Sequence, residues 1–558
     1  MDRVYALVVV IALIAGVGLR VARLGSVPLG FDQDEACSAY DAYSILKTGR
    51  DHHGNFLPLA LQAFNDYRMA LFGYSLIPVI GLFGLKPAVV RLGAAIWGSV
   101  DLAAVTLLTG LMLGWPGAAV ASVLYALSPW QLPLSRFCHE AITASATVSV
   151  AMACFFIWLR QRGDRWLLLS GAFFGLSLYA YSITKVFTPL MIGWLGLFYW
   201  RELKEVRSKA AAALGIVALL AVPQGILFLR RTAEMQARVN DIFIFGQAGG
   251  PFLTRLENFG AGFISYFTAS YLFFTGDRGD HWALLHPPGV GQLLPVQAVL
   301  IALALAALAG GRRRKSALLL LAWLIFATVP AALTVPPGAL LLQANAPHGV
   351  PTAFILISHR ESLQRAPFTP SLALAHPNLR RDVLAIAPWT LLSALGFVAL
   401  LDWVRRWPAA AMGLAGLLLA GATFQGVRFV RSYFRDYPIV AAPYFQYGMA
   451  EVMEAVQRLG GAHEPVVITD LINQPYIYVL FYESYPPALF QQGPVVQMQG
   501  LWGPVLQFDR YLFVSPQRAY PQLAKGIFVF AGDESTPVPP ALSVHYPDGT
   551  IAYNIVVK

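Results

Sequence analysis

The chain has 558 residues, of which 57% are hydrophobic and 13% charged, and its mean hydropathy is +0.58. This hydropathy excludes an ordinary soluble protein, and the long apolar runs predict a polytopic α-helical membrane protein. The formal net charge of +10 comes from 40 basic and 30 acidic residues, but no soluble basic module accompanies it, so we predict no nucleic-acid partner. The cysteines form neither a paired framework nor a CxxC motif, so neither a disulfide scaffold nor a structural zinc site is predicted; they are Cys37, Cys138 and Cys154.

The first apolar segment, residues 4–19, predicts an uncleaved signal anchor. The polar sequence RVARLGSVPLGF follows it, and no small-residue cleavage site is present. Ten further apolar stretches are long enough to cross a bilayer, so we predict eleven transmembrane helices in all. These stretches are 91–112, 117–132, 141–159, 166–181, 186–200, 209–229, 290–309, 316–334, 384–401 and 409–426.

The basic residues predict how these helices are oriented. With the N-terminus in the cytoplasm, four inside loops carry 13 Lys and Arg, as positive-inside topology requires; the loops are 160–165, 201–209, 312–315 and 402–407. Such a multi-pass protein of the plasma (inner) membrane exposes segments 20–90, 133–140, 230–289 and 335–383 outside. A twelfth span at 69–84 would invert every later loop, so we assign that apolar stretch to an interfacial helix in the first outer loop.

The tail from about residue 430 predicts a small α/β domain. Its β-rich runs PVVITDL, RYLFVS and GIFVFAG alternate with the helical stretch YGMAEVMEAVQRLGG, and the hairpin pattern LSVHYPDGTIAYNIVV ends it. We therefore predict a membrane domain at 1–430 and an extracytoplasmic (periplasmic) domain at 431–558. No internal repeat is visible, which disfavours transporter folds built from duplicated halves.

The stretch FDQDEACSAYDAYSILKTG, residues 31–49, concentrates acid just after the first apolar segment. Asp32 and Glu35 have the spacing of a capping box, and Gly49 is a suitable C-cap, so we predict a helix over 33–48. For Asp32 and Glu35 a structural and a functional role stay equally open. Asp34 has no part in the cap, and a carboxylate so near the bilayer has to face water, a cation or a partner.

A second group of polar residues lies in the outer loop SPWQLPLSRFCHEAITAS, which holds Arg136, His139 and Glu140. Glu140 either stabilises a helix N-terminus or shares a pocket with Asp34, as a base and its partner or as ligands of a divalent cation such as Mg, Mn or Ca. Basic residues on the outer side either snorkel to lipid headgroups or bind a lipid phosphate. They are Arg68, Lys185, Arg231, Arg238, His376, Arg380 and Arg381.

These residues resemble a known family. The sequence GFDQDEACSAYDAYSILKTGRDHHGNFLPLALQAFNDYRMALFGY, followed by GLKPAVVRLGAAIWG, is similar to the opening of bacterial dolichyl-phosphate-mannose-protein mannosyltransferase-like proteins of family 39. Those proteins belong to the GT-C class of lipid-linked-sugar glycosyltransferases, with the lipid A aminoarabinose transferases. LSLYAYSITKVFTPL and HPNLRRDVLAIAPWTLLSALG also match, and the resemblance runs from about residue 5 to about 490.

The resemblance implies a GT-C fold and a membrane glycosyltransferase. Such an enzyme transfers a hexose or pentose from a polyprenyl-phosphate donor to a hydroxyl of a glycan, lipid or protein acceptor, with inversion. By resemblance, Asp34 is the catalytic acidic residue with Glu35 as its neighbour, and Glu140 is the second acid. Arg68, Lys185, His376, Arg380 and Arg381 correspond to donor phosphate-binding positions, and Arg136, His139 and Tyr181 are further pocket candidates. Residues 345–375 look like extra sequence before the His-Arg segment.

The chemistry explains why acid is needed near the bilayer. A polyprenyl phosphate is a good leaving group, so the reaction needs a base at the acceptor hydroxyl, which Asp34 suits, and cations at the phosphate. A divalent cation between Asp34 and Glu140 stays open, because members of the class differ in metal use. Two rival functions are a secondary transporter, which would carry charges near the midplane, and a non-catalytic GT-C-fold scaffold subunit, which would have lost the acids.

Overall fold

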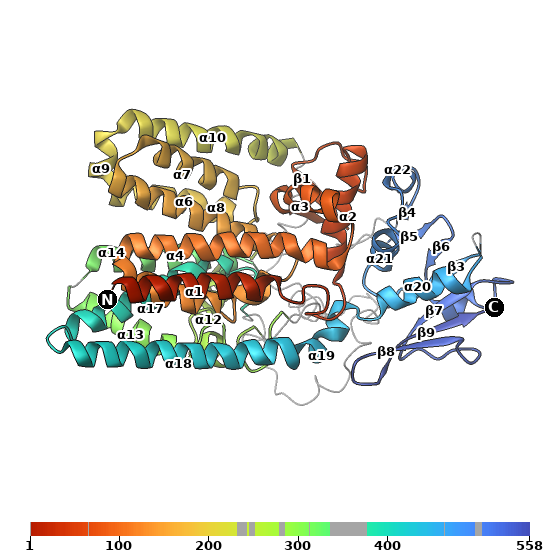
Figure 1. The fold of residues 1–558 in the computed structure, drawn as a ribbon. Coiled ribbons are helices and arrows are strands. Elements are labelled where there is room, and N and C mark those ends of the chain that lie inside the picture. The colour runs from red at the N-terminus through yellow and green to blue at the C-terminus, as the bar shows by residue number, and fades with distance from the viewer. Residues whose placement is uncertain are drawn as a thin grey trace.

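The polypeptide forms a bundle of long helices with a small mixed sheet at one end (Figure 1). The computed structural model describes residues 2–64, 66–230, 243–244, 252–277, 285–311, 313–334, 377–461, 464–496 and 505–558. The predicted residues Arg231, Arg238 and His376 and the segment 345–375 lie outside these ranges.

Each of the eleven predicted apolar stretches overlaps a helix of the bundle. These helices are α1 (Asp2–Val21), α4 (Pro87–Ala126), α6 (Ala141–Gln161), α7 (Asp164–Ser177), α8 (Thr184–Phe198), α10 (Arg207–Arg230), α13 (Val296–Ala309), α14 (Arg314–Ala332), α17 (Ile386–Trp403) and α18 (Pro408–Arg435). Helix α4 contains two of the predicted stretches, because the backbone leaves helical geometry only at Gly114 (φ 79°), two residues before Pro116. Short helices α5 (Gln131–Leu134), α9 (Trp200–Glu205) and α12 (Phe252–Ser265) and a π-helical turn, η1 (Ser270–Phe274), complete this region.

Seven helices of the described chain are long and apolar enough to cross a membrane, namely α1, α4, α6, α10, α14, α17 and α18. Helices α7, α8 and α13 have only 14, 15 and 14 residues. The polytopic helical membrane fold is therefore confirmed, whereas the count of eleven spans stays a prediction. The predicted stretch 166–181 is longer than α7 because the chain turns after Ser177.

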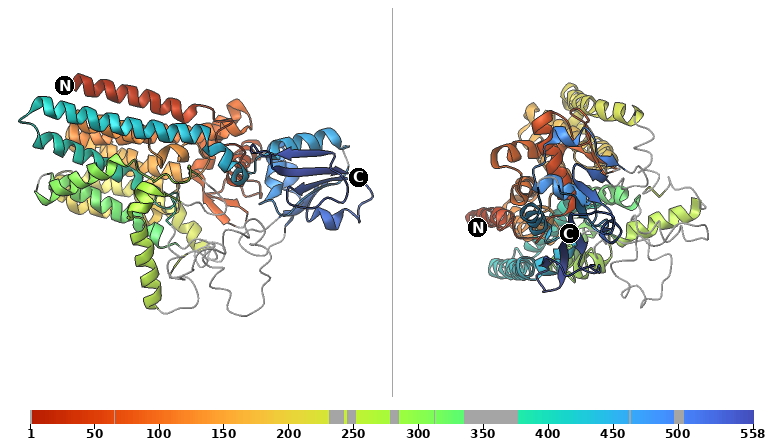
Figure 2. Two further views of the ribbon diagram at one scale, coloured as in Figure 1. Left: turned by 90° about the horizontal axis from the view of Figure 1, so that it is seen from below. Right: turned by 90° about the vertical axis from the view of Figure 1, so that its right-hand side faces the viewer.

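The helices divide into central and peripheral members. About nine tenths of the apolar windows of α6 and α17 are buried, at 89% and 94%, whereas only 11% to 22% is buried in α1, α10 and α18. Central helices touch protein on all sides, and apolar peripheral helices present a surface suited to lipid. Gly396 lets α17 approach α13 closely, since a Cβ there would lie 1.7 Å from the Leu300 carbonyl oxygen. Helix α12 lies outside the bundle at a steep angle to it (Figure 2).

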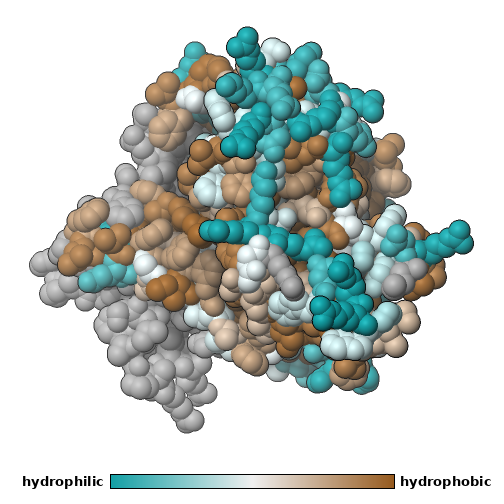
Figure 3. All heavy atoms as spheres, turned by 90° about the vertical axis from the view of Figure 1, so that its left-hand side faces the viewer, coloured by the Kyte–Doolittle hydropathy of each residue, from teal (hydrophilic) through white to brown (hydrophobic). Residues whose placement is uncertain are grey.

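The four basic loops gather at the end of the bundle that lies opposite the sheet. Ion pairs connect them across the sequence, and they join Arg162 to Glu205 (3.9 Å), Lys209 to Asp164 (3.5 Å), Arg313 to Asp402 (3.1 Å) and Lys315 to Glu202 (3.3 Å). Figure 3 views this end, where polar side chains spread over the apolar helices. These loops therefore share one side of the molecule, as the predicted topology requires.

The segment predicted to be the first outer loop, residues 20–90, folds at the other end, beside the sheet (Figure 1). It contains α2 (Gln33–Thr48), the antiparallel hairpin of β1 (Ala60–Ala63) and β2 (Asp66–Met69), and the apolar α3 (Ala70–Phe83). The predicted capping box and C-cap of α2 are confirmed. The Asp34 N–H donates to Asp32 Oδ1 (2.8 Å), the Asp32 N–H donates to Glu35 Oε2 (3.2 Å), and Gly49 ends the helix at φ 69°. The hairpin was not predicted.

The tail forms a seven-stranded sheet in the order β4-β5-β6-β3-β7-β9-β8. The predicted runs form β3 (Val466–Ile468), β6 (Tyr511–Phe513), β7 (Ile527–Ala531) and the hairpin β8 (Leu542–His545)–β9 (Ile551–Val557), whereas β4 (Val495–Val496) and β5 (Val505–Phe508) were not predicted. Strand β3 pairs in parallel with β6 and β7, and the other pairs are antiparallel. The helices of the tail are α19 (Tyr437–Ala441), α20 (Met449–Leu459), α21 (Pro475–Tyr482), α22 (Pro487–Phe490) and α23 (Pro516–Ala519), with a 3-10 turn at Ala442–Phe445. Another 3-10 turn, Val383–Ala385, directly precedes α17 in the bundle.

The sheet domain rests on α2 of the first outer loop. The Tyr40 hydroxyl donates to the Tyr485 carbonyl oxygen (2.7 Å), and Gln491 Nε2 donates to the Asp51 carbonyl oxygen (2.9 Å). Since α18 continues past residue 430 to Arg435, the predicted division at 430/431 falls within a helix and stays a prediction.

The predicted topology can be tested with single cysteines, since the three native thiols are buried. Ser535→Cys, on an exposed turn of the sheet domain, should react with an impermeant thiol reagent on intact cells. The matched control Ser208→Cys, exposed at the opposite end, should react only after lysis. The reverse labelling pattern would invert the topology.

Candidate functional site

Asp34 lies in the first turn of α2 and is held by Arg68 from β2. Arg68 Nη2 donates to Asp34 Oδ1 (2.5 Å), while its Nη1 donates to the Asp34 carbonyl oxygen (2.8 Å) and to Ser38 Oγ (3.0 Å). The side chains of Arg68 and Asp34 are 12% and 23% exposed, so the pair is partly accessible to water. The β1–β2 hairpin therefore serves to bring Arg68 to the N-terminus of α2.

Arg380, in the segment before α17, lies close to the same carboxylate. Its Nη1 lies 3.9 Å from Asp34 Oδ2. The segment that carries it is fixed by Leu379, whose N–H donates to Asp277 Oδ2 (3.0 Å) and whose carbonyl oxygen accepts from Trp130 Nε1 (2.9 Å). Two guanidinium groups thus bracket one carboxylate and leave a positive excess, which suits binding of an anion.

Glu35 points into the protein, away from this cluster. It is fully buried and pairs with Arg91 of α4 through Arg91 Nε to Oε1 (2.9 Å) and Nη2 to Oε2 (2.7 Å). The Cys138 N–H donates to the same Oε1 (3.2 Å). Protein groups therefore occupy both oxygens of Glu35, and its predicted catalytic role stays a prediction.

Asp32 lies beside these acids and is buried. Burial raises the pKa of the Asp32 carboxyl well above its ordinary value, and the charges of Asp34 and Glu35 raise it further. Asp32 therefore holds a proton at a higher pH than an ordinary carboxyl, and it still accepts from the Asp34 N–H through Oδ1.

Glu140, His139 and Tyr181 form a second group. Glu140 is buried at the N-cap position of α6, and the His139 ring meets the Tyr181 ring edge-on with 5.6 Å between centroids. The Thr143 hydroxyl lies 2.6 Å from the Glu140 carbonyl oxygen and 3.3 Å from that of Ala180, so α6 and the loop before α8 are tied together. The structure thus brings three of the predicted residues into one neighbourhood.

Arg136 has a different role. Its buried guanidinium donates to the carbonyl oxygens of Leu19 (2.7 Å), Arg20 (3.0 Å) and Val27 (3.0 Å), and lies 4.6 Å from the Phe434 ring centre. These contacts hold the C-terminal end of α1, so Arg136 stabilises the bundle.

The remaining predicted cations point in different directions. Arg381 Nη1 donates to Thr334 Oγ1 (3.2 Å), after the end of α14, whereas its neighbour Arg380 reaches Asp34. Lys185 is half-buried in the first turn of α8, and no side chain in the described ranges forms an ion pair with it. Among the predicted phosphate-binding cations that lie in the described ranges, Arg68 and Arg380 are the ones that contact Asp34.

Sequence reasoning missed three residues that build the site: Arg91, Asp277 and Trp130. Arg91 stood at the boundary of a predicted span, where an arginine is ordinary. Its position after the apolar run PAVV, at the start of α4, was a usable signal, because a charge at such a depth needs a partner.

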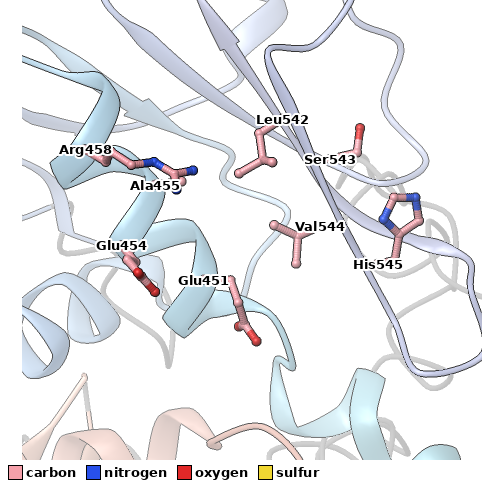
Figure 4. Close-up of a pocket in the computed structure, with 8 residues that line it drawn as sticks. All are labelled: Glu451, Glu454, Ala455, Arg458, Leu542, Ser543, Val544 and His545. Carbon is pink, nitrogen blue, oxygen red and sulfur yellow. The ribbon is translucent and has the colours of Figure 1, made fainter.

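One pocket lies apart from these residues, in the sheet domain between α20 and β8 (Figure 4). It has a volume of about 340 Å³, and Glu451, Glu454, Arg458 and His545 line it with neighbouring apolar side chains. None of the predicted site residues belongs to it.

The comparisons with known proteins agree with this architecture. Residues 71–226 match the family model of dolichyl-phosphate-mannose-protein mannosyltransferase, a segment that includes Glu140 and Lys185 but not Asp34, Arg68 or Arg380. No curated protein matches the chain. The crystal structure of ArnT from Cupriavidus metallidurans bound to undecaprenyl phosphate superposes with a TM-score of 0.56 at 12% identity, over 99% of this chain and 97% of that one. The chain has the GT-C fold.

The apo structure of the same ArnT gives a TM-score of 0.55 at 13% identity, again over 99% of this chain and 97% of ArnT. The GT-C fold accounts for both the helical bundle and the sheet domain, since the likeness spans nearly the whole of both chains. The predicted fold class is therefore confirmed.

The buried ion pair makes a stability prediction. Glu35→Gln leaves the Arg91 guanidinium buried without its counter-charge, and breaking such a pair costs about 3–5 kcal/mol. The matched control Glu205→Gln removes an exposed partner 3.9 Å from Arg162, which should cost roughly 0–1 kcal/mol. Thermal unfolding in detergent measures both, and equal shifts would contradict the structural role of Glu35.

Proposed function

We propose that this protein is a membrane glycosyltransferase that moves a sugar from a polyprenyl-phosphate donor to an acceptor hydroxyl on the extracytoplasmic face, with inversion at C1. The observation that carries the proposal is the part-exposed Asp34 carboxylate between Arg68 and Arg380, in a chain with the GT-C fold. The cluster lies at the end of the bundle next to the sheet domain (Figure 1). There a donor's isoprenoid can stay in lipid while its sugar meets the acceptor.

The three side chains divide the chemistry between them. The acceptor oxygen attacks C1 of the sugar, its proton passes to an Asp34 carboxylate oxygen, and the bond from C1 to the phosphate oxygen breaks with its electron pair leaving on the phosphate. The phosphodiester of the donor carries one negative charge, and the departing phosphate gains another. Arg68 and Arg380 stabilise this growing charge, which is where transition-state stabilisation is most effective.

Donor binding also prepares the base. In the structure Arg68 and Arg380 both face Asp34, and a donor phosphate competes for the same guanidinium groups. As the phosphate takes over these contacts, the Asp34 oxygens become available to the acceptor hydroxyl. The base is thereby released only when the donor is in place.

A divalent cation at Asp34 is a second way to assist the reaction. Mg, Mn or Ca bound to Asp34 would supply Lewis-acid assistance at the phosphate. The residues present fit such an ion only if Arg68 and Arg380 move off the Asp34 oxygens, which they contact at 2.5 and 3.9 Å. The arrangement thus favours the guanidinium groups of Arg68 and Arg380 over a metal ion as the partners of the phosphate charge.

The acceptor is a glycan, a lipid or a protein hydroxyl. A non-catalytic scaffold subunit with the same fold is the alternative function, but such a subunit has no need for an incompletely buried acid held between two arginines. A transporter is less well supported, because these charges lie at the ends of the helices rather than at mid-bundle.

Asp34→Asn tests the base. The variant keeps the size of the side chain and its contact with Arg68, so it should fold normally, while turnover of a polyprenyl-phosphate-sugar by purified protein in nanodiscs should fall about 10²–10⁴-fold. Glu140→Gln, measured in parallel, reports on the second acid. A fully active, well-folded Asp34→Asn protein would overturn the assignment.

Neighbouring arginines provide a matched test of the phosphate contacts. Arg68→Ala and Arg380→Ala should raise the donor KM and lower kcat, because each removes a cation that faces Asp34. Arg381→Ala should behave nearly as the parent, since Arg381 is directed to Thr334. Arg68→Lys should retain part of the activity, because lysine keeps the positive charge but cannot donate two parallel hydrogen bonds as a guanidinium does. Equal effects at positions 380 and 381 would contradict the proposed geometry.

A further inference from the structure

A cluster of metal-ligating side chains lies on α2 outside the site already described. Cys37 and Asp41 are one helical turn apart on the same face, and the Cys37 Sγ lies 3.9 Å from Asp41 Oδ2. His52 follows the end of α2 and brings its Nδ1 to 2.6 Å from Asp41 Oδ1. All three side chains are buried, and one ligand atom from each lies within 4.8 Å of the others.

These separations are close to those of a tetrahedral zinc site. With Zn–S bonds of about 2.3 Å and Zn–N or Zn–O bonds of about 2.0 Å, neighbouring ligand atoms are about 3.3–3.5 Å apart. The separation of 3.9 Å from Cys37 Sγ to Asp41 Oδ2 is wider, and that of 2.6 Å from His52 Nδ1 to Asp41 Oδ1 is narrower; the two distances end on different oxygens of the same carboxylate. Shifts on the order of half an ångström, within the reach of side-chain rotation, convert one arrangement into the other.

A second imidazole and an outer partner lie next to these three residues. The His53 ring lies 4.0 Å from the His52 ring, and its Nε2 is buried without a hydrogen-bond partner within the described ranges. A buried nitrogen of this kind costs stability unless something binds it. His52 Nε2 lies 3.2 Å from the Tyr476 hydroxyl of α21, the type of second contact that orients a metal-bound imidazole.

We propose that Cys37, Asp41 and His52 bind one zinc ion that braces α2 against the sheet domain, and that the neighbouring His53 ring turns toward the ion as the fourth ligand. Thiolate and imidazole ligands select zinc over Mg or Ca, which prefer oxygen. On binding, the Cys37 thiol gives up its proton to solvent and the Sγ–Zn bond forms. One thiolate and one carboxylate then balance the two charges of the ion, so the buried site is neutral.

The position of the ion gives it a structural purpose. Cys37 is three residues after Asp34 on the same helix, and Tyr476 connects His52 to α21. A zinc ion there would tie the middle of α2 to the segment that follows the helix, and through Tyr476 to the sheet domain. The site is distinct from a cation at Asp34 and Glu140, in both its ligands and its metal preference, and it stands whether or not the proposed transfer reaction is correct.

Metal content of the full-length protein tests the proposal. Protein purified in detergent from zinc-supplied cells and dialysed against a weak chelator should retain about one zinc per chain by mass spectrometry. Cys37→Ser and His52→Ala should lose it, whereas the matched control Cys154→Ser, a buried thiol in α6, should keep it. Asp34→Asn should also keep its zinc although inactive, which separates this site from the proposed reaction.

A second measurement uses the parent protein, so it does not depend on whether a variant folds. Parent protein stripped of metal and loaded with cobalt(II) should show thiolate-to-cobalt charge-transfer absorption, and a strong chelator should lower its thermal unfolding midpoint. Monodisperse parent protein with far less than one zinc per chain and no such absorption would overturn the proposal. Zinc retained undiminished by folded Cys37→Ser and His52→Ala would overturn it as well, because the ion would then be bound elsewhere.

Discussion

The buried pair of Glu35 and Arg91 is the interaction on which the end of the molecule beside the sheet domain depends. Two charges without exposure to water carry a large desolvation cost, which only good geometry and further hydrogen bonds offset. Arg91 supplies these bonds by donating to the carbonyl oxygens of Leu24 (3.2 Å), Pro28 (2.8 Å) and Gly30 (2.9 Å). Glu35 accepts from the Asp32 and Cys138 backbone N–H groups. One ion pair therefore joins the loop after α1, the start of α2, α4 and the loop before α6.

This constraint places the neighbouring carboxylate. In a helix, successive side chains point about 100° apart, so fixing Glu35 inward turns Asp34 toward the outside of the first turn. There it meets Arg68, which the β1–β2 hairpin carries, and Arg380, which follows more than three hundred residues later. Three segments remote in sequence thus form one charged cluster, and each is anchored by contacts that involve no substrate.

The sheet domain takes part in the same arrangement. Tyr485 and Gln491 contact α2 at Tyr40 and Ser44, beyond the turn that bears Asp34, and Tyr476 contacts His52 just after the helix. The helix that carries the acid is thus packed on the bundle at its first turn and on the sheet domain along its later turns. Such support on two sides is what a site requires when its side chains must hold their positions during a reaction.

The sequence by itself determined the features that depend on local pattern. Hydropathy located the helices, the Asp32–Glu35 spacing and Gly49 determined both ends of α2, and alternation located β3, β6, β7 and the final hairpin. The sequence also identified Asp34 and Arg68 as candidate site residues, because a charge beside a bilayer is costly unless it has a function or a partner. Only the tertiary structure decided which charges meet. Neighbouring residues Arg380 and Arg381 diverge, Arg136 holds α1, Arg91 pairs with Glu35, and Cys37 joins Asp41 and His52 although the cysteine spacings indicated no metal site. The physical reason is that periodicity and capping arise from bonds a few residues apart, whereas an ion pair or a ligand set arises from packing between segments whose separation no local pattern encodes.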